Sequence, residues 1–521
     1  MKSSSSARAR FGIVMIAALG VLAAACSSAS PARPPGPPAA QPEASGSWPD
    51  PNADLSNTRV APDSLITAAN VTKLRQAWSF PITGTAAAGV GGAGSLAAAP
   101  IVQNGVVYLQ DLDANVYAIA LATGKLKWEY QANTPEKTGP GPDGVAVANG
   151  RVYGDTPATV FALSASTGKT IWVDRDLLSK GQGTFEIQPA EAGGRVYLAS
   201  AYGDGPGGGV LMALNAATGV RIWSFNTLLA ADPGVQAVGL GSGGAWETPL
   251  IGTDGSVTFG IGNPYQSPAS ALAHPSAQLY TDSDVSLDAA TGTLRWYYQG
   301  VPNDFKDYDM QASPISASAH GVPVVLGAGK MGYVYEMNAG TGRLIWKTPV
   351  GAHNGHDNDS LLALEHQITL KAPYTILPGT VGGVLTNLAE DDGTVYVVTN
   401  DLALTFTKLT QPLPSSGSGK MAGEVEALSL ATGKVEWDTK VSNLPLGAAT
   451  VSNGLLLTTL LSGQLIAINR ATGQIVFRHQ LPTTTNAPIA VAGNTVLVPA
   501  GGLALHGGPA VNPQLVAYTV P

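Results

Sequence analysis

The chain has 521 residues, of which 44% are hydrophobic and only 12% are charged, and its formal net charge is −8. The apolar content is ample for a packed core, so the composition excludes a largely disordered chain. The acidic balance, with no Lys/Arg run beyond the first residues, provides no basic face for phosphate backbones and argues against a nucleic-acid partner. Small molecules and proteins remain as partner classes.

An export signal is predicted at residues 1–25. A positively charged start is followed by the apolar stretch 11–25, which is too short to span a bilayer comfortably. The stretch ends in two alanines before Cys26, an arrangement that resembles the lipobox of bacterial lipoproteins with its usual leucine displaced to Leu22. We therefore expect export and a lipid on Cys26 that anchors the chain at the extracytoplasmic face of the cell membrane. An ordinary secretory signal with an incidental cysteine is the alternative.

A short tether and one large domain are expected after the signal. Residues 26–46 are rich in serine, alanine and proline, a composition that buries too little apolar surface to fold. Residues 47–521 are expected to form the folded domain. Because Cys26 is the only cysteine in the sequence, this domain has no disulfide, no cysteine-based metal site and no covalent haem motif.

One pattern recurs along the folded domain: an alternating apolar strand, a Thr-Gly pair, and a short strand with an aromatic residue four positions after the glycine. Alternation is typical of a half-buried strand and Thr-Gly of a tight turn, so each copy predicts a β-hairpin. The aromatic side chain is expected to wedge between neighbouring sheets. The seven glycines are Gly124, Gly168, Gly219, Gly292, Gly342, Gly433 and Gly473, and their aromatic residues are Trp128, Trp172, Trp223, Trp296, Trp346, Trp437 and Phe477.

The spacing of these copies indicates the architecture. It varies from about 40 to about 90 residues, which excludes a strict solenoid and favours a β-propeller whose blades carry different insertions. Seven copies predict at least seven blades. Residues 74–80 and 514–520 together predict an eighth, which would close the ring and leave no free sheet edge. We therefore expect an all-β, eight-bladed β-propeller with tryptophan-docking motifs, and seven blades as the alternative.

The repeat, most often Ala-x-x-x-x-Thr-Gly-x-x-x-Trp, resembles the tryptophan-docking motif of the pyrroloquinoline quinone (PQQ) dehydrogenases. The segment from Trp48 to Trp78 is also similar to the first segment of those quinoproteins, and the resemblance continues to the C-terminus. The sequences around Asp307 (YDMQASPI) and Lys330 (GAGKMGYVYEMNAGTG) resemble the polyvinyl-alcohol-dehydrogenase-like branch most. Non-enzymatic scaffolds, including the outer-membrane assembly lipoprotein, use the same blades, so the site residues must decide the function.

The resemblance implies a metal beside the quinone, held by oxygen ligands. Ca²⁺ or another hard cation prefers such ligands and polarises a carbonyl as a Lewis acid. Asp307 matches the aspartate that removes the alcohol proton in the family, and Asp309 occupies the position found in members that use a lanthanide. Asp204 stands where the family has a glutamate ligand. The implied metal ligands are Asp204, Asn263, Asp307 and Asp309.

The resemblance also implies a PQQ pocket. Trp246 matches the tryptophan on which the quinone stacks, and Lys330 falls where the family places a cation that contacts the quinone oxygens and stabilises charge during catalysis. Thr156 and Asn387 lie near positions that hydrogen-bond the cofactor in relatives. The alternative is that these residues have structural roles only: Asn263 holds the turn before Pro264, Trp246 packs between blades, and the aspartates are turn residues.

Three departures from the family concern this pocket. The vicinal cysteine pair of many relatives is missing, Asp143 stands where an arginine is expected, and Lys306 replaces a tryptophan. A negative Asp143 would repel a tricarboxylated quinone unless a metal or a lysine compensates, so loss of PQQ binding is the alternative. The segment 353–359 offers histidines and carboxylates as metal ligands, but it also has the Asn-Gly chemistry of a solvated loop.

These observations predict an exported quinoprotein dehydrogenase that oxidises an alcohol, polyol or sugar with metal-bound PQQ, with Asp307 as the base. Because the chain has no haem motif, a separate electron acceptor is expected. The alternative is a non-catalytic PQQ-like propeller that serves as a binding or assembly scaffold in the cell envelope.

Overall fold

A computed structural model describes residues 46–83, 94–134, 141, 143–201, 208–229, 243–413, 416–418 (backbone only), 420–503 and 511–521, all within one compact unit, Gln41–Pro521. The predicted signal, Cys26, almost all of the tether and Asp204 lie outside these residues. Within them, no helix has the length and apolar character needed to cross a bilayer.

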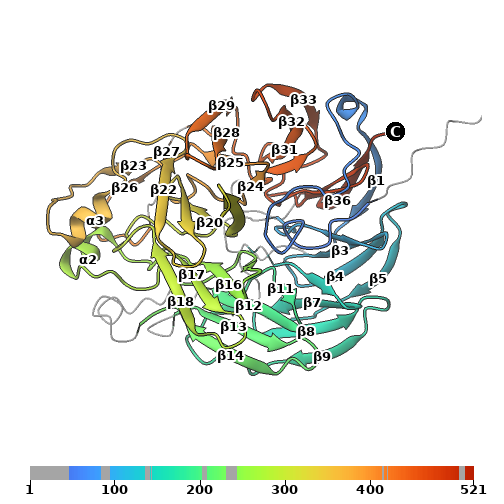
Figure 1. The fold of residues 1–521 in the computed structure, drawn as a ribbon, viewed down its shortest axis with the longest axis horizontal. Helices are drawn as coiled ribbons and strands as arrows, with labels where there is room; N and C mark the ends of the chain where they lie inside the picture. Colours follow the sequence, from blue (N-terminus) through green and yellow to red (C-terminus); the bar gives the residue numbers. More distant parts are fainter. Residues whose placement is uncertain are drawn as a thin grey trace, which may run out of the picture. The chain divides into compact units, whose positions relative to one another are not determined.

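The fold is an eight-bladed β-propeller, as predicted, and Figure 1 shows its blades in chain order. Each blade is an antiparallel sheet built around four strands. In most blades these strands follow one another closely along the chain. Blade 1 comprises β2 (Ile101–Gln103), β3 (Val106–Gln110), β4 (Val116–Ala120) and β5 (Leu126–Tyr130). Blade 2 comprises β6 (Ala146–Ala148), β7 (Arg151–Thr156), β8 (Thr159–Ser164) and β9 (Thr170–Asp174). Blade 3 comprises β11 (Ala190–Ala192), β12 (Arg195–Ala201), β13 (Val210–Asn215) and β14 (Arg221–Asn226), with β10 (Thr184–Phe185) also paired to β12.

The next four blades repeat this plan, with long connections within blade 4, within blade 6 and between blades 5 and 6. Blade 4 comprises β15 (Leu250–Ile251), β16 (Ser256–Gly260), β17 (Ser283–Asp288) and β18 (Leu294–Gln299). Blade 5 comprises β19 (Ile315–Ala319), β20 (Val322–Gly329), β21 (Tyr333–Asn338) and β22 (Leu344–Pro349). Blade 6 comprises β24 (Ala389–Asp391), β25 (Thr394–Asn400), β28 (Gly423–Ser429) and β29 (Val435–Val441). Blade 7 comprises β30 (Thr450–Ser452), β31 (Leu455–Leu460), β32 (Gln464–Asn469) and β33 (Ile475–Gln480).

Blade 8 closes the ring with strands from both ends of the propeller. It comprises β34 (Ala490–Ala492), β35 (Thr495–Ala500), β36 (Gln514–Thr519) and β1 (Arg75–Pro81). Strand β1 pairs antiparallel with β36 from Arg75–Thr519 to Pro81–Gln514, and Figure 1 shows the first and last colours of the chain side by side there. The predicted eighth blade is therefore confirmed.

The repeated tryptophans join successive blades. The indole N–H of Trp346, for example, donates to the carbonyl of Leu430 in the next blade at 3.0 Å. Its ring packs on Gly433, where a Cβ atom would lie 2.6 Å from the indole, and Gly433 has a φ of +67°. Glycine is therefore required there both by the close approach and by the left-handed turn. The same donor–carbonyl contact joins Trp78 to Leu121, Trp128 to Ala165, Trp172 to Ala216, Trp223 to Ala289, Trp296 to Ala339 and Trp437 to Arg470.

The segment before β1 also fastens blades together. Arg59, which is fully buried, donates from Nε to the Ala449 carbonyl at 2.7 Å and from Nη2 to the Ile489 carbonyl at 2.8 Å. Its Nη1 donates to the Asn52 side chain at 2.8 Å. One buried guanidinium thus ties this segment to blades 7 and 8. A short 3₁₀ turn, η1 (Val71–Lys73), leads into β1.

A region built from three separate insertions, one within blade 4, one between blades 5 and 6 and one within blade 6, carries the remaining elements. It contains α2 (Pro268–Ala273), α3 (Asp359–Leu364) and a small sheet of β23 (Tyr374–Ile376), β26 (Ala403–Phe406) and β27 (Ser416–Ser418). The two helices contact each other, and Figure 1 shows them side by side at the outer edge of this part of the propeller. Buried aromatic residues, including Phe305, Tyr308 and Phe406, form the core beneath them.

Candidate active site

Asp307 lies on a tight turn that its neighbour Asp304 holds in place. The Asp304 carboxylate accepts the backbone N–H of Lys306 at 3.0 Å and that of Tyr308 at 2.8 Å. Between these two residues Asp307 adopts a φ of 63°. This left-handed conformation is uncommon for residues other than glycine, although aspartate tolerates it better than most, and it is often found at functional sites. Asp304 is therefore a positioning residue that our sequence reasoning did not identify.

Lys330 brings a positive charge to this turn from the end of β20. Its Nζ lies 3.1 Å from Asp307 Oδ2 and also contacts Asp309 Oδ2 closely, while its backbone N–H donates to the Asp309 carbonyl at 3.0 Å. Burial alone would lower the pKa of Lys330, but the two aspartates outweigh it and the pKa rises. Burial raises the pKa of Asp307 well above its usual value, against the opposing effect of Lys330. The structure thus brings three of the predicted site residues together.

Asn263 and Trp246 approach the same group from blade 4. The backbone N–H of Asn263 donates to Asp309 Oδ1 at 2.8 Å. At Gly262, a Cβ atom would lie 2.8 Å from the Trp246 ring and 2.9 Å from Asp309 Oδ1, so only glycine allows the ring and the carboxylate to come this close. Trp246 is half-buried. It therefore lies beside the Asp307 group and is partly exposed.

The donor set of this group fits a hard cation. Asn263 Oδ1 and Asp307 Oδ1 are buried and accept no hydrogen bond among the described residues, although buried polar atoms normally have a partner. Amide and carboxylate oxygens are the ligands that Ca²⁺ prefers. Both oxygens of Asp309 are engaged, one by Asn263 and the other by Lys330. Asp309 therefore borders the open donors, and its role as a ligand, like that of Asp204, stays a prediction.

The other two predicted cofactor residues have contacts elsewhere. The hydroxyl of Thr156 lies 2.9 Å from that of Thr159, in a hollow of about 290 Å³ at the ends of blade 2 strands. Asn387 accepts the Ser313 N–H at 2.8 Å and donates to Glu247 Oε2 at 3.0 Å. Glu247 follows Trp246 in the sequence, so Asn387 contacts the residue next to the tryptophan on which the quinone is expected to stack. Their roles in cofactor binding stay predictions.

Lys306, at the position where the resemblance predicts a tryptophan, holds a neighbouring loop. It is fully buried, and its Nζ donates to the carbonyls of His356 at 2.7 Å and Asp357 at 3.1 Å. In the loop 353–359, His353 Nδ1 lies 2.6 Å from Asp357 and His356 Nδ1 lies 2.9 Å from Asp359. Each histidine is thus paired with a carboxylate, and the loop fastens the residue that precedes Asp307.

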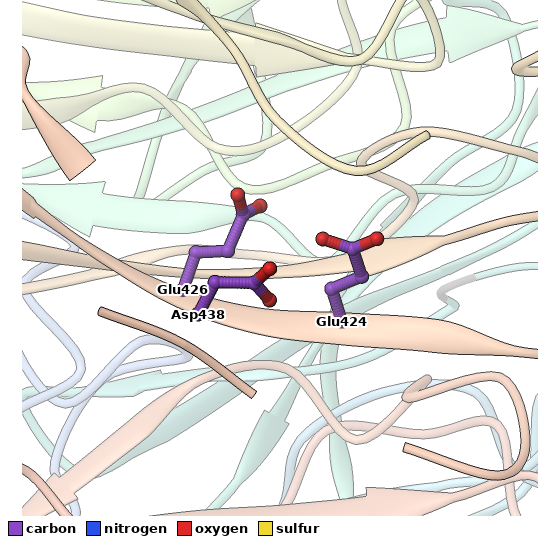
Figure 2. Close-up of side chains that lie close together, drawn as sticks. All are labelled: Glu424, Glu426 and Asp438. Atoms are coloured by element: carbon purple, nitrogen blue, oxygen red, sulfur yellow. The ribbon is translucent and has the colours of Figure 1, made fainter. Parts of the chain in front are cut away.

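A separate acidic triad lies on blade 6. The carboxylate oxygens of Glu424, Glu426 and Asp438 come within 4.8 Å of one another, and Figure 2 shows the three side chains directed toward a common point. Lys440 pairs with Glu424 and, at 2.9 Å, with Asp438, while Glu426 accepts the N–H of Gly351 at 3.0 Å. All three carboxylates therefore have partners, and the triad is a satisfied polar cluster.

Comparisons with known proteins show what the chain is similar to. The family model for the β-propeller domain of glucose, ethanol and alcohol dehydrogenases matches residues 48–147 and 209–351, and the model for the outer membrane protein assembly factor BamB matches 136–240 and 421–511. A quinoprotein alcohol dehydrogenase of Pseudomonas putida is 25% identical over 82% of this chain and 80% of its own length. A quinohemoprotein alcohol dehydrogenase of Comamonas testosteroni is 25% identical over 87% of this chain and 71% of its own length.

Solved structures give the same fold. The match to the crystal structure of the quinohemoprotein alcohol dehydrogenase from Comamonas testosteroni spans 91% of this chain and 80% of that chain. Its TM-score is 0.75, and the two sequences are 22% identical. The match to a europium-containing methanol dehydrogenase spans 91% of this chain and 98% of the methanol dehydrogenase chain. Its TM-score is also 0.75, and the two sequences are 19% identical. Family model and sequence relatives thus show that the chain resembles the quinoprotein alcohol dehydrogenases, and the solved structures show that it has the fold of a PQQ-like β-propeller.

Proposed function

We propose that this protein is an exported quinoprotein dehydrogenase that oxidises an alcohol, polyol or sugar with PQQ and a hard cation. The observation that carries the proposal is the buried group of Asp307, Lys330 and Asn263 beside Trp246, in a chain whose relatives are named quinoprotein alcohol dehydrogenases. The open oxygens Asn263 Oδ1 and Asp307 Oδ1 would hold the cation. When bound, PQQ supplies a two-electron oxidant and the cation supplies Lewis acidity beside it.

Asp307 is the proposed base. A base must approach the hydroxyl proton to hydrogen-bond distance, and the turn held by Asp304 fixes the direction of this side chain. Only the unprotonated carboxylate can accept the proton. Since burial raises the pKa of Asp307, the neighbouring Lys330 is needed to favour the charged form at neutral pH. Lys330 would also place a fixed positive charge where negative charge develops in the reaction.

The buried residue Asp143 is the main obstacle to PQQ binding. Asp143, which stands where relatives have an arginine, is fully buried, and an uncompensated carboxylate there would oppose a tricarboxylated cofactor. The residues around Trp246 and Lys330 nevertheless provide a ring surface, a cation and open oxygen donors. We therefore propose that PQQ binds beside Trp246 and Lys330, and that its affinity depends on a bound cation.

Reconstitution tests this function. We would titrate the mature chain with PQQ by calorimetry, with and without Ca²⁺ or La³⁺, and then measure dye-linked oxidation of a panel of alcohols and aldoses. Metal-dependent binding and turnover are expected. Asp307→Asn should retain the fold and lower turnover by about 10²–10⁴-fold, because it removes the base. A matched variant of an exposed carboxylate, Asp254→Asn, should keep full activity. Absence of PQQ binding under every metal would refute the proposal.

The match to the assembly-factor model favours one alternative. That model covers parts of blades 2, 3, 6, 7 and 8, and the alternative is a propeller that binds envelope protein or glycan without chemistry. The same titration separates the two functions, because a scaffold would bind no PQQ.

We also propose that the chain is lipid-anchored at Cys26, that it faces outward from the cell membrane, and that it passes electrons to a separate acceptor. The signal-like start and the single cysteine support this proposal. Mass spectrometry of the mature N-terminus should find a lipid on Cys26. Cys26→Ser should release the protein from the membrane fraction, whereas a variant that stays membrane-bound without a lipid would contradict the anchor.

A further inference from the structure

A hollow of about 660 Å³ lies where the start of α3 meets β23, and we call it the α3–β23 hollow. Residues from the segments 354–359 and 368–375 line it. Its volume falls within the range of about 300–1,000 Å³ that is typical of small-molecule sites. The proposed reaction gives this hollow no role, although part of its wall is the loop 353–359, whose histidines and carboxylates stand out in the sequence.

Three side chains that line the hollow are hydrogen-bonded to one another. Asp359 Oδ2 accepts the Tyr374 hydroxyl at 2.7 Å and lies 2.9 Å from His356 Nδ1. The rings of His356 and Tyr374 meet edge to face, with their centroids 4.9 Å apart. Asp359 and Tyr374 are buried, whereas the side chain of His356 is 40% exposed. His356 is therefore held through Nδ1, while its Nε2 has no hydrogen-bond partner within the described residues.

The other side chains of the hollow are of two kinds. Ile368 and Leu370 are half-buried and Pro373 is exposed, and all three present hydrocarbon. Thr369 and Lys371 are exposed, and Lys371 pairs with no carboxylate in the described part of the chain. A ligand in the hollow would therefore meet both apolar surface and hydrogen-bonding groups.

This mixture excludes several classes of ligand. A metal ion needs several close ligands. Among the described residues, the only three histidine, cysteine or carboxylate side chains within 4.8 Å of one another belong to the triad on blade 6. A multiply charged anion would find one lysine and would lie near the Asp359 carboxylate. A purely apolar ligand would leave the polar groups without partners.

We propose that the α3–β23 hollow binds a neutral saccharide. The ring of a sugar has an apolar C–H face, which suits Ile368, Leu370 and Pro373, and its hydroxyls both donate and accept hydrogen bonds. His356 Nε2 and the Lys371 ammonium would pair with these hydroxyls. The contact of His356 with Asp359 already fixes the imidazole, so little side-chain freedom is lost there on binding.

The hollow shares its wall with the turn that carries Asp307. The Tyr374 ring lies 6.3 Å from that of Phe305, and the His356 carbonyl accepts the Lys306 ammonium at 2.7 Å. A bound saccharide would therefore touch residues that directly support this turn, and we assign the hollow to the selection of saccharides over small alcohols. This role rests on the proposed quinoprotein function, whereas saccharide binding itself does not.

Binding is measured on the full mature chain in chelator and without PQQ, so that no turnover takes place. Maltotriose is titrated by calorimetry and by saturation-transfer NMR, and glucuronate serves as the anionic comparison. Maltotriose is expected to bind more tightly than glucuronate. The double variant His356→Ala/Lys371→Ala should weaken maltotriose binding about 10–100-fold, because it removes both hydrogen-bond partners.

The matched control is His274→Ala/Lys408→Ala, which removes an exposed histidine and an exposed lysine outside the hollow and should keep the wild-type affinity. Circular dichroism and thermal melting check that both double variants fold. Folding is expected, because the substituted side chains are half-exposed or exposed and the His356 carbonyl that accepts from Lys306 is retained.

The proposal is overturned if maltotriose does not bind, if glucuronate binds more tightly, or if His356→Ala/Lys371→Ala keeps the wild-type affinity. Maltotriose binding without PQQ binding under any metal would refute the quinoprotein function alone. PQQ-dependent turnover without maltotriose binding would refute the saccharide site alone. With both present, the same double variant should raise the KM for maltotriose more than the KM for ethanol, and equal changes would overturn the role in selection.

Discussion

Glu426→Gln makes a quantitative test of the acidic triad. Glu426 is 5% exposed, and burial, followed by the charges of Glu424 and Asp438, raises its pKa from 4.5 to about 8. The folded protein therefore holds this proton up to about pH 8, whereas the unfolded chain releases it near pH 4.5. Stability contributed by the protonated group is present below pH 4.5 and is lost as the pH rises toward 8. Glutamine keeps the side-chain oxygen that accepts the Gly351 N–H and removes the titration.

The size of the effect follows from the shift. Each pKa unit corresponds to about 1.4 kcal/mol, so the shift from 4.5 to about 8 amounts to at most about 5 kcal/mol. Asp438 is partly exposed and its partner Lys440 is 66% exposed, so solvent screens part of this effect, and we expect about 2–4 kcal/mol. Glu426→Gln should therefore match the wild type near pH 5 and exceed its free energy of unfolding by that amount at pH 8.

Denaturant unfolding followed by circular dichroism at pH 5, 6.5 and 8, in chelator, measures this difference. The control is Glu436→Gln, an exposed carboxylate on β29 of the same blade, which should follow the wild-type profile. If the stability difference between Glu426→Gln and the wild type is the same at pH 5 and at pH 8, the raised pKa of Glu426 is refuted.

Four further outcomes are expected. Trp346→Ala should cost about 3 kcal/mol of stability in denaturant melts, because it removes the ring that packs on the next blade. Arg59→Met should cost about 2–4 kcal/mol by leaving buried carbonyls unpaired, and limited proteolysis should then cleave the segment before β1. Asp304→Ala should lower alcohol oxidation while PQQ still binds, since the Asp307 turn loses two hydrogen bonds. Wild-type oxidation should rise with pH as Asp307, whose pKa is raised, loses its proton, and a rate that falls over pH 6–9 would contradict Asp307 as base.

The propeller was predictable because its information is local. Each Thr-Gly turn and its aromatic residue lie within one short window of sequence, and the same window recurs in seven blades. The tryptophan rings and the glycines beneath them then join consecutive blades, so a local pattern also sets the packing. The eighth blade required pairing segments from the two ends of the domain, and alternation in both was enough to identify it.

The candidate site was only partly predictable. The turn around Asp307 and the segment around Lys330 each carry a recognisable motif, and the structure brings these two side chains to 3.1 Å. Asp304 carries no motif of its own, because its role depends on the two backbone N–H groups that donate to its carboxylate in the folded turn. The position of Asn387 against Glu247 likewise depends on how distant blades meet, which no single stretch of sequence encodes.

The pairing of β1 with β36 has a consequence for the order of folding. The last blade cannot assemble until β36 is available, so until then the edges of β1 and β35 that β36 covers stay unpaired. Such edges invite pairing with another chain. The pairing of strand β36 thus ends the period in which these edges are exposed, and its removal by truncation should leave a propeller that aggregates through them.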